Sequence, residues 1–347
     1  MIFRVLLLPF AVLYGFVIAV RNFLYDHGYF RAENVGVPVI SIGNISVGGT
    51  GKTPLVEILL GHLLQKDLRP AVVSRGYKRK SKGTVVVSDG KRVVANAING
   101  GDEPLQLARK FSSAIVVVDE VRTRGARVAI DSYGAQIVIL DDGFQHRAMR
   151  RDLDIVLLDA AEKKSRRWYL PAGRGRESLR NLARANVIVH TRLKGDVGAR
   201  FSAEVTQRTN ARQFRMSSKA ESIVKVADGK RGSITEIQGK NCLAFCGIAK
   251  PKNFRSIIEE LGVKIQRFLP FPDHHYYTED DLKRIQKIFA EFKHDFILTT
   301  EKDAARLDNE KLKDLEFFSS LYYVELKASI AGEERFFEII GQAISKK

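Results

Sequence analysis

The stretch SIGNISVGGTGKTP at residues 41–54 decides how the rest of the chain is interpreted. Residues 37–42 predict a short buried strand, a glycine-rich loop follows, and the apolar residues after Thr53 begin a helix. Glycines allow backbone N–H groups to turn toward an anion, and the positive end of the helix faces the same point. We therefore expect a phosphate-binding loop in which Lys52 reaches the terminal phosphates of ATP and the Thr53 hydroxyl binds Mg²⁺. The predicted loop residues are Ser46, Val47, Gly48, Gly49, Thr50, Gly51, Lys52 and Thr53.

The loop departs from the general pattern at one position, because residue 46 is Ser where that pattern has Gly. The alternative to a phosphate-binding loop is a glycine-rich turn before a helix, in which Lys52 is exposed to solvent and binds no phosphate. The lysine–threonine end of the loop and its strand–loop–helix setting favour phosphate binding.

Length and composition describe a globular protein. The chain has 347 residues, 45% of them hydrophobic and 28% charged, which is enough for about two domains with cores. Its net charge of +17 indicates an anionic partner, and both nucleic acid and an acidic membrane surface qualify. The two cysteines, Cys242 and Cys246, lie in one predicted strand, so we expect them to pack in the core rather than to bind zinc.

Residues 5–20 form an almost continuous apolar segment near the N-terminus. As a helix it would be about 24 Å long at about 1.5 Å per residue, which is shorter than the hydrocarbon core of a bilayer, about 30 Å. We favour an interfacial anchor flanked by Arg21 and Arg31 over a buried core helix or a true span. No small-residue cleavage site follows, which argues against a signal peptide.

Polar residues follow several predicted strands, as ligand-binding residues do in open α/β sheets. The strand predicted at residues 70–74 ends at Ser74 and is followed by Arg75. The strand predicted at residues 136–140 is followed by Asp141 and Asp142. A strand that ends in Asp supplies the second support for Mg²⁺ in phosphate-binding-loop proteins, so we expect the Asp pair to hold the metal. Asp102 begins a predicted helix, where it could cap the helix or act as a general base.

Alternating strands and helices predict a P-loop NTPase-like, mostly parallel sheet with helices on both faces, followed by a smaller second α/β domain. The expected segments are an anchor helix at 1–35, a P-loop domain at 36–200, an extended linker at 201–239 and the second domain at 240–347. In the second domain, residues 271–275 bring His274 next to an Asp, and residues 299–303 end a strand. Both segments could reach a cleft between the domains, or simply cap helices.

Taken together, these motifs resemble the tetraacyldisaccharide 4′-kinases, the lipid A 4′-kinases of lipopolysaccharide biosynthesis. The resemblance rests on residues 43–54, 74–77, 101–104, 141–146, 170–174, 273–275 and 300–303. It covers nearly the whole chain up to about residue 306, and Ser46 is shared with the family.

The resemblance implies a peripheral enzyme on the cytoplasmic face of the inner membrane, held there by its N-terminal helix. It implies transfer of the γ-phosphate of ATP to the 4′-hydroxyl of a tetraacyldisaccharide 1-phosphate, a lipid A precursor, giving lipid IVA. By the same analogy, Lys52 and Thr53 hold phosphate and Mg²⁺, Asp102 takes the hydroxyl proton, and His274 tunes Asp102. More loosely, it puts the following residues near the substrate: Ser74, Arg75, Glu103, Arg122, Gln145, His146, Arg176 and Glu177. Arg124 and Arg127 in the same predicted helix compete with Arg122 for that role.

Two other functions are open to a chain of this composition. A membrane-associated P-loop ATPase switch without a sugar acceptor would typically carry Lys where Val47 stands. A nucleic-acid-binding protein would be supported by charge alone, since no aromatic and basic array accompanies it. We therefore expect a glycolipid and a membrane surface as partners, and neither nucleic acid nor an obligatory protein partner.

Overall fold

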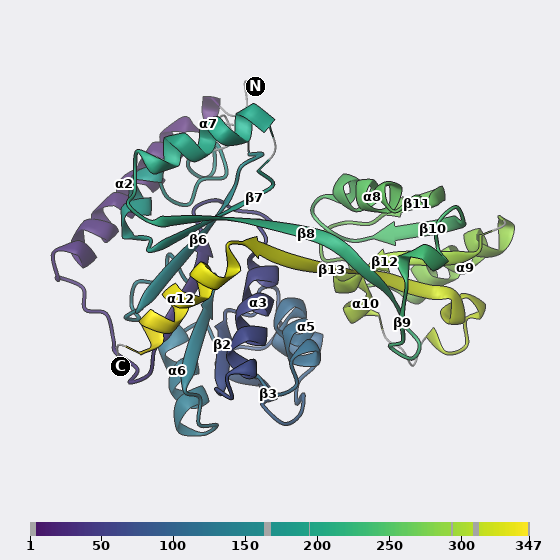
Figure 1. Cartoon of the computed structure of the whole chain (residues 1–347), viewed down its shortest axis with the longest axis horizontal. Coiled ribbons are helices and arrows are strands. Elements are labelled where there is room, and N and C mark those ends of the chain that lie inside the picture. The colour runs from purple at the N-terminus through teal and green to yellow at the C-terminus, as the bar shows by residue number, and fades with distance from the viewer. Residues whose placement is uncertain (1–4, 163–167, 194, 293, 308–311, 346–347) are drawn as a thin grey trace. The chain divides into compact units, whose positions relative to one another are not determined.

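The computed structural model describes residues 5–162, 168–193, 195–292, 294–307 and 312–345 (Figure 1). The chain divides into two compact units: unit 1 is Met1–Ser217 with Ala328–Lys347, and unit 2 is Ser218–Lys327. Strands β8 (Arg212–Lys225) and β13 (Leu321–Ala331) each contain one of the two boundaries.

Unit 1 is built on a mostly parallel sheet. Its further strands are β1 (Val39–Asn44), β2 (Pro70–Ser74), β3 (Val85–Asp89), β4 (Ile115–Val118), β5 (Ile137–Asp141), β6 (Leu153–Asp159) and β7 (Val187–Thr191). The order across the sheet is β8-β7-β6-β1-β5-β2-β4-β3, and only β3 is antiparallel to its neighbour. Every residue of β1, β2, β4, β5 and β7 is buried, as expected for parallel strands covered on both faces.

Helices cover both faces of this sheet. They are α3 (Lys52–Gln65), α4 (Ala97–Gly100), α5 (Asp102–Lys110), α6 (Arg122–Asp131), α7 (Gly195–Thr206), the 3₁₀ helix η2 (Leu179–Arg184) and α12 (Glu333–Ile344). Helices α3 and α12 share one hydrophobic cluster with alternate residues of β1 and β5. Helix α6 packs on the residues of β1 and β5 that point to the other face, and α7 packs on residues of β6 and β7. This architecture confirms the predicted fold class.

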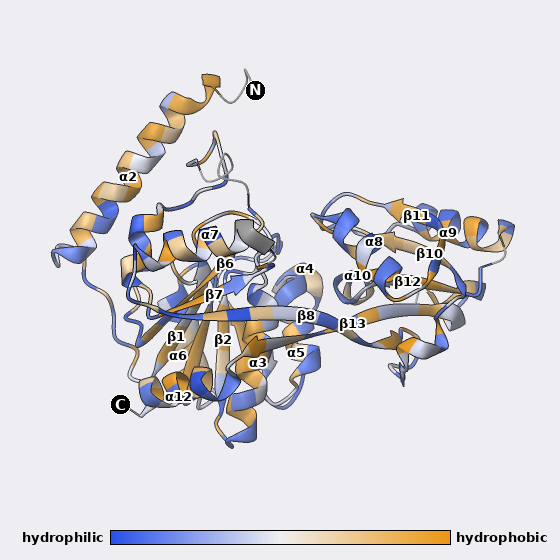
Figure 2. Ribbon diagram, turned by 45° about the horizontal axis from the view of Figure 1, so that its top comes forward, coloured by the Kyte–Doolittle hydropathy of each residue, from blue (hydrophilic) through white to orange (hydrophobic). Residues whose placement is uncertain are grey.

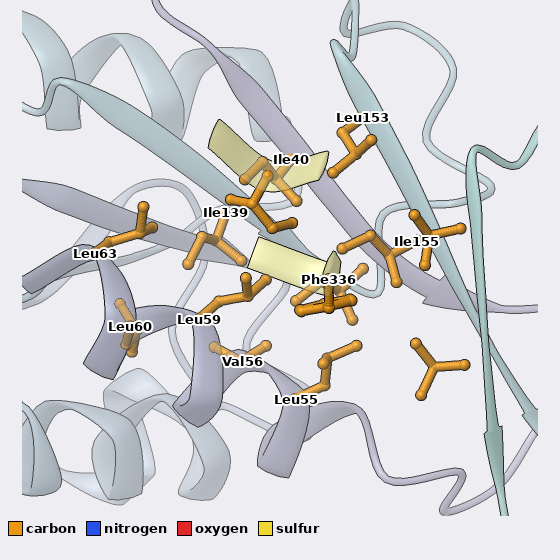
Figure 3. Packing of buried hydrophobic residues seen from close by; sticks show 14 of the residues in the cluster. Ile40, Leu55, Val56, Leu59, Leu60, Leu63, Ile139, Leu153, Ile155 and Phe336 are labelled. Atoms are coloured by element: carbon orange, nitrogen blue, oxygen red, sulfur yellow. The ribbon is translucent and has the colours of Figure 1, made fainter. Parts of the chain in front are cut away.

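The C-terminal helix α12 belongs to unit 1, although the sequence predicted it in the second domain. Phe336 is fully buried among Leu55, Leu59 and Ile155 of the cluster that supports the glycine-rich loop (Figure 3). Phe337 on the same helix stacks on His62 of α3, with ring centroids 3.6 Å apart. The chain therefore returns to unit 1 after completing unit 2.

Helix α2 (Leu8–Asp26) has one buried face and one exposed apolar face. Ala11, Gly15, Ile18 and Asn22 form the buried face, at helical spacing. The exposed apolar side chains are Phe10, Val12, Leu13, Phe16, Val17, Val20 and Phe23, and Figure 2 shows apolar residues along most of the helix. Among the described residues, α2 is the one helix long and apolar enough to cross a membrane, a test that core helices and signal sequences also pass.

Unit 2 contains a smaller set of parallel strands, which belong to the same hydrogen-bonded sheet as those of unit 1. Its elements are β9 (Arg231–Gly232), η3 (Ile234–Glu236), β10 (Asn241–Cys246), α8 (Pro251–Glu260), β11 (Lys264–Pro270), α9 (Glu279–Glu291), β12 (Phe296–Thr300), α10 (Glu301–Arg306) and η4 (Glu316–Ser320). Strands β11, β10, β12 and β13 pair in that order, all parallel. Cys242 and Cys246 are buried on β10, and burial raises the pKa of both thiols to about 12, which suits core residues.

The predicted linker at 201–239 is more structured than the sequence indicated. It contains the second half of helix α7 and the 14-residue strand β8. Phe201 and Val205 of α7 are buried in a cluster with Val156 and Ile188, so this helix is part of the unit 1 core.

Candidate active site

The carboxyl ends of β1, β2, β4, β5, β6 and β7 meet at one edge of the unit 1 sheet, called here the carboxyl edge. The glycine-rich loop leaves this edge after Asn44 and enters α3 at Lys52. Gly48 has φ of 127° and Gly51 of 92°, which is the region where glycine is favoured. Because glycine has no side chain, these two positions allow the loop to turn its backbone toward the carboxyl edge.

Neighbouring residues hold the loop in place. The Asn44 side-chain amide donates to Thr50 Oγ1 at 2.9 Å, and the Thr191 hydroxyl donates to the Thr50 carbonyl at 3.1 Å. On the other side, the Val47 N–H donates to the Arg174 carbonyl at 2.8 Å. The loop is therefore fixed by β1, by β7 and by the segment that contains Arg174.

Asp141 and Asp142 lie beside this loop because β5 is the parallel neighbour of β1. Asp141 pairs in register with Ile42, and the Gly143 N–H donates to the Ile42 carbonyl at 3.0 Å. Asp142 adopts a left-handed φ of 53°, and its carboxylate lies 3.4 Å from Lys52 Nζ. The two motifs that the sequence assigned to phosphate and metal are thus adjacent.

The two aspartates differ in their electrostatic environment. Burial raises the pKa of Asp141 to about 6, with a further contribution from Glu103 that Lys52 only partly offsets. Burial also opposes ionisation of Asp142, but Lys52 and Arg176 outweigh it and lower the pKa of that carboxyl. Asp142 is accordingly an anion held by two cations, whereas Asp141 is a buried carboxyl whose charge Lys52 and Arg122 only partly favour.

Arg176 connects the arginine-bearing loop to the aspartates. Its guanidinium donates to both carboxylate oxygens of Asp142, at 2.9 and 2.8 Å, and to Gln145 Oε1 at 3.4 Å. Gln145 in turn donates to the Asn44 carbonyl and to Glu177. The predicted substrate residues Gln145, Arg176 and Glu177 therefore lie together at the carboxyl edge.

Glu177 is 2% exposed and is surrounded by donors from other elements. Its carboxylate accepts from Asn22 at 3.2 Å, from Asn181 at 2.7 Å and from Arg184 at 2.8 Å. The bond to Asn22 ties helix α2 to the loop that carries Arg176. These contacts support a structural role for Glu177, and direct contact with substrate stays a prediction.

Arg122 is distinguished from the two arginines that compete with it. Arg124 is paired with Asp119 at 2.7 Å and Arg127 with Glu33 at 2.6 Å. Arg122 is 8% exposed; burial lowers the pKa of its guanidinium, and Asp142 and Asp141 are among the groups that favour its charge. Arg122 is thus the arginine of α6 that interacts with both aspartates.

Asp102 and Glu103 occupy the first turn of α5, where the helix dipole favours carboxylates. Asp102 is 7% exposed, and Gly101, with φ of 87°, is the N-cap residue. A side chain at Gly101 would lie 3.3 Å from the Gly76 Cα, so this turn packs closely on the segment after Ser74. Arg75 in that segment is exposed and lies within electrostatic range of Arg122.

The two predicted histidines occupy different environments. Burial lowers the pKa of His146 to about 4, with the charges of Arg122 and Arg151 adding to the effect, so its ring is neutral near pH 7. A neutral ring does not supply positive charge to a phosphate. His274 lies in unit 2, after β11, so its predicted action on Asp102 stays a prediction.

Sequence reasoning did not find four residues that shape the loop: Asn44, Arg174, Thr191 and Arg192. Arg192 donates to the Gly49 carbonyl at 3.1 Å and is also paired with Asp159. Thr191 and Arg192 follow a predicted strand, which is the signal that identified Asp141. Nothing in the sequence shows that β7 ends beside the loop.

Comparison with known proteins gives consistent matches over the whole chain. Residues 3–345 match the sequence model of the family described as Tetraacyldisaccharide-1-P 4′-kinase. A Tetraacyldisaccharide 4′-kinase of Chlorobaculum parvum is 39% identical over 315 residues, which are 89% of this chain and 86% of that protein. Another, from Flavobacterium johnsoniae, is 36% identical over 97% of this chain and 95% of its own. A crystal structure of LpxK from Aquifex aeolicus in complex with ATP superposes with a TM-score of 0.82 at 34% identity, covering 99% of both chains.

Proposed function

The chain belongs to the tetraacyldisaccharide-1-phosphate 4′-kinase family, and we propose that the groups at the carboxyl edge of unit 1 perform its phosphoryl transfer. The enzyme transfers the γ-phosphoryl group of ATP to the 4′-hydroxyl of a tetraacyldisaccharide 1-phosphate, a step of lipid A biosynthesis. The observation that best supports the proposed site is the 3.4 Å distance between Lys52, the first residue of α3, and Asp142, which follows β5, the parallel neighbour of β1.

Phosphoryl transfer requires positioning and neutralisation of charge, because charge spreads over the oxygens of the transferred group. In our proposal, the phosphates are bound by backbone N–H groups of the loop other than that of Val47, which is bonded to Arg174, and by the first turn of α3. Lys52 leaves its contact with Asp142 to bind the terminal phosphates, and Arg122 and Arg176 supply further positive charge. Arg176 provides a fork that matches phosphate oxygens, since a guanidinium has several donors in one plane.

The residues at this edge fit a magnesium ion. Asp141 is a buried carboxyl whose pKa burial and Glu103 raise, so a cation beside it would replace missing positive charge. Thr53, at 8% exposure, offers a hydroxyl oxygen from the first turn of α3. Within the described residues, no group of three or more His, Cys, Asp or Glu side chains could hold a metal unaided. That is the expected situation for Mg²⁺, which binds to one or two protein groups and otherwise to phosphates and water.

We assign Mg²⁺ to Thr53 and Asp141, with Asp142 in support through its contact to Arg176. The bound ion would neutralise charge on the β- and γ-phosphates. Asp102 is the general base: it accepts the proton of the sugar hydroxyl as the bond from that oxygen to the γ-phosphorus forms and the bond to ADP breaks. Burial of Asp102 beside the segment of Ser74 and Arg75 supports this assignment, and His274 assists Asp102.

We propose that the enzyme binds the cytoplasmic face of the inner membrane through α2. The exposed apolar face of this helix, the net charge of +17 and a substrate with four acyl chains all support a peripheral attachment. Its buried face contacts the active-site segment through Asn22 and Glu177, so a helix lying in the lipid surface would keep that segment near the substrate.

A direct test uses ATP labelled at its γ-phosphate and a tetraacyldisaccharide 1-phosphate in mixed micelles. The proposed function predicts labelled lipid with the new phosphate on the 4′-oxygen, and little ATP hydrolysis when lipid is left out. Equal ATP hydrolysis with and without lipid, and no labelled lipid, would contradict it and favour an ATPase switch.

A further inference from the structure

Arg306 links the two motifs of unit 2 that the sequence singled out as candidates for the active site. It is the last residue of α10, and its side chain is 1% exposed. Its Nη2 atom lies within hydrogen-bond distance of His274 Nδ1, at 3.3 Å. Its Nη1 atom donates to the Gly247 carbonyl and to Asp303 Oδ1, each at 3.0 Å.

The guanidinium is held by a fully buried carboxylate. Asp303 is 0% exposed and accepts from the Gly247 N–H at 3.0 Å, the Tyr277 hydroxyl at 3.0 Å and the Thr300 hydroxyl at 2.5 Å. A planar guanidinium paired with a buried carboxylate has little freedom to rotate. The donor that faces His274 is therefore fixed in direction.

The backbone of His274 is tied to the same point. Its φ of 61° lies in the left-handed region, and its N–H donates to the Gly247 carbonyl at 3.0 Å. A side chain at Gly247 would lie 3.0 Å from the His275 Cβ and 3.1 Å from the Pro272 carbonyl. Gly247 thus allows the turn to approach the end of β10, where Arg306 contacts both the backbone and the ring.

The chemistry of the two groups decides the tautomer of the histidine. A guanidinium has only N–H donors, so Nδ1 of His274 must accept, and the proton of the neutral ring is then on Nε2. Asp273 Oδ1 lies 3.9 Å from that Nε2 atom, on the side where the proton is expected. The hydrogen-bond partner of Nδ1 thus determines that Nε2 carries the proton.

We propose that Arg306 is a positioning residue that holds His274 as the Nε2–H tautomer, the form in which the ring can donate a hydrogen bond from Nε2. This inference rests on the proposed function, in which His274 assists Asp102. In that role His274 keeps its own proton at Nε2, and the sugar proton goes to Asp102 alone. Neutral His274 is a donor at Nε2 and not a second base.

Long-range ¹H–¹⁵N spectra of the full-length protein with ¹⁵N-labelled histidine test the tautomer directly. The His274 signals are assigned as those lost in His274→Gln. We expect the pattern of a ring protonated at Nε2 in the wild type, and loss of this preference in Arg306→Met. A wild-type ring protonated at Nδ1 would overturn the proposal.

Turnover tests the positioning role. Fixing a histidine in the correct tautomer contributes up to about 10⁴-fold to turnover where such a device has been dissected, and we expect Arg306→Met to lower kcat at least about tenfold. KM for ATP should be unchanged, because the proposed nucleotide site lies in unit 1. Arg306→Lys, which keeps a donor, should recover part of the loss.

Tyr277→Phe is the matched control, since it removes another bond to Asp303 and leaves the bond from Arg306 to His274. Its kcat should stay near that of the wild type. Equal losses in Arg306→Met and Tyr277→Phe, or normal turnover in folded Arg306→Met, would overturn the positioning role. Failure of the wild type to phosphorylate the lipid would count against the proposed function, whereas the tautomer is read from the spectrum alone.

Discussion

Gly43→Ala tests whether the phosphate-binding loop and the aspartates form one rigid assembly. Gly43 lies in β1, one residue before the strand ends. A Cβ at this position would lie 2.5 Å from the Phe144 Cβ and 2.7 Å from the Phe144 backbone nitrogen. Phe144 cannot simply rotate away, because the obstructing atoms belong to its backbone and Cβ. Its ring is fully buried, with the Arg184 guanidinium 4.5 Å from the ring centroid.

The substitution must therefore move β1 and the segment after Asp142 apart. Overpacking of this kind costs about 1–3 kcal/mol, which corresponds to a loss of roughly 2–12 °C in Tm for a unit of this size. The same movement would separate Lys52 from Asp142, so we also expect weaker ATP binding and lower kcat. Thermal unfolding, ATP titration and the lipid phosphorylation assay measure the three effects.

Gly61→Ala is the control for the substitution itself. Gly61 lies inside α3, and a Cβ there would meet only Phe111, at an ordinary 3.9 Å. Replacing a helical glycine by alanine stabilises by about 0.5–1 kcal/mol, so the two variants should change Tm in opposite directions. A Gly43→Ala protein with wild-type Tm and ATP affinity would refute the close packing of the two motifs.

Three further predictions concern the nucleotide, the core and the membrane. Lys52→Ala should lower kcat by at least about 10² while Tm stays close to wild type; near-normal turnover would remove Lys52 from the phosphate site. Phe336→Ala should destabilise the protein by about 3–5 kcal/mol in denaturant unfolding, although α12 carries no site residue; an unchanged midpoint would show that α12 is not part of the unit 1 core. Replacing the exposed Phe10 and Phe16 by Ser should weaken binding to anionic vesicles at least about tenfold in sedimentation without a loss of Tm, and unchanged binding would contradict attachment through α2.

The sequence predicted those parts of the site that are encoded in short continuous segments. The glycine-rich loop and the Asp pair each follow a predicted strand, so local patterns were sufficient to propose them. At Asp102 the local pattern fits a helix cap as well as a base, and the base role came only from the family resemblance. The sequence could not tell which arginine of α6 faces the aspartates, because that depends on how the helix is rotated. The structure resolves this through the ion pairs that hold Arg124 to Asp119 and Arg127 to Glu33.

Contacts between distant segments were beyond prediction from one sequence. Strand order across the sheet brings β7 beside β6, and so brings Thr191 and Arg192 to a loop about 140 residues earlier. Helix α12 returns to unit 1 because Phe336 and Ile340 complete the cluster around α3, which no local signal reveals. The boundary predicted at residue 200 falls inside helix α7, which is only 12 residues long.

The central claim is that Asp102 at the carboxyl edge takes the proton of the sugar hydroxyl. The most direct measurement is single-turnover phosphoryl transfer by Asp102→Asn, a change that preserves size and removes the base. The account predicts a rate of transfer lower by at least about 10², with ATP affinity and Tm unchanged. Transfer at the wild-type rate by this variant would contradict it.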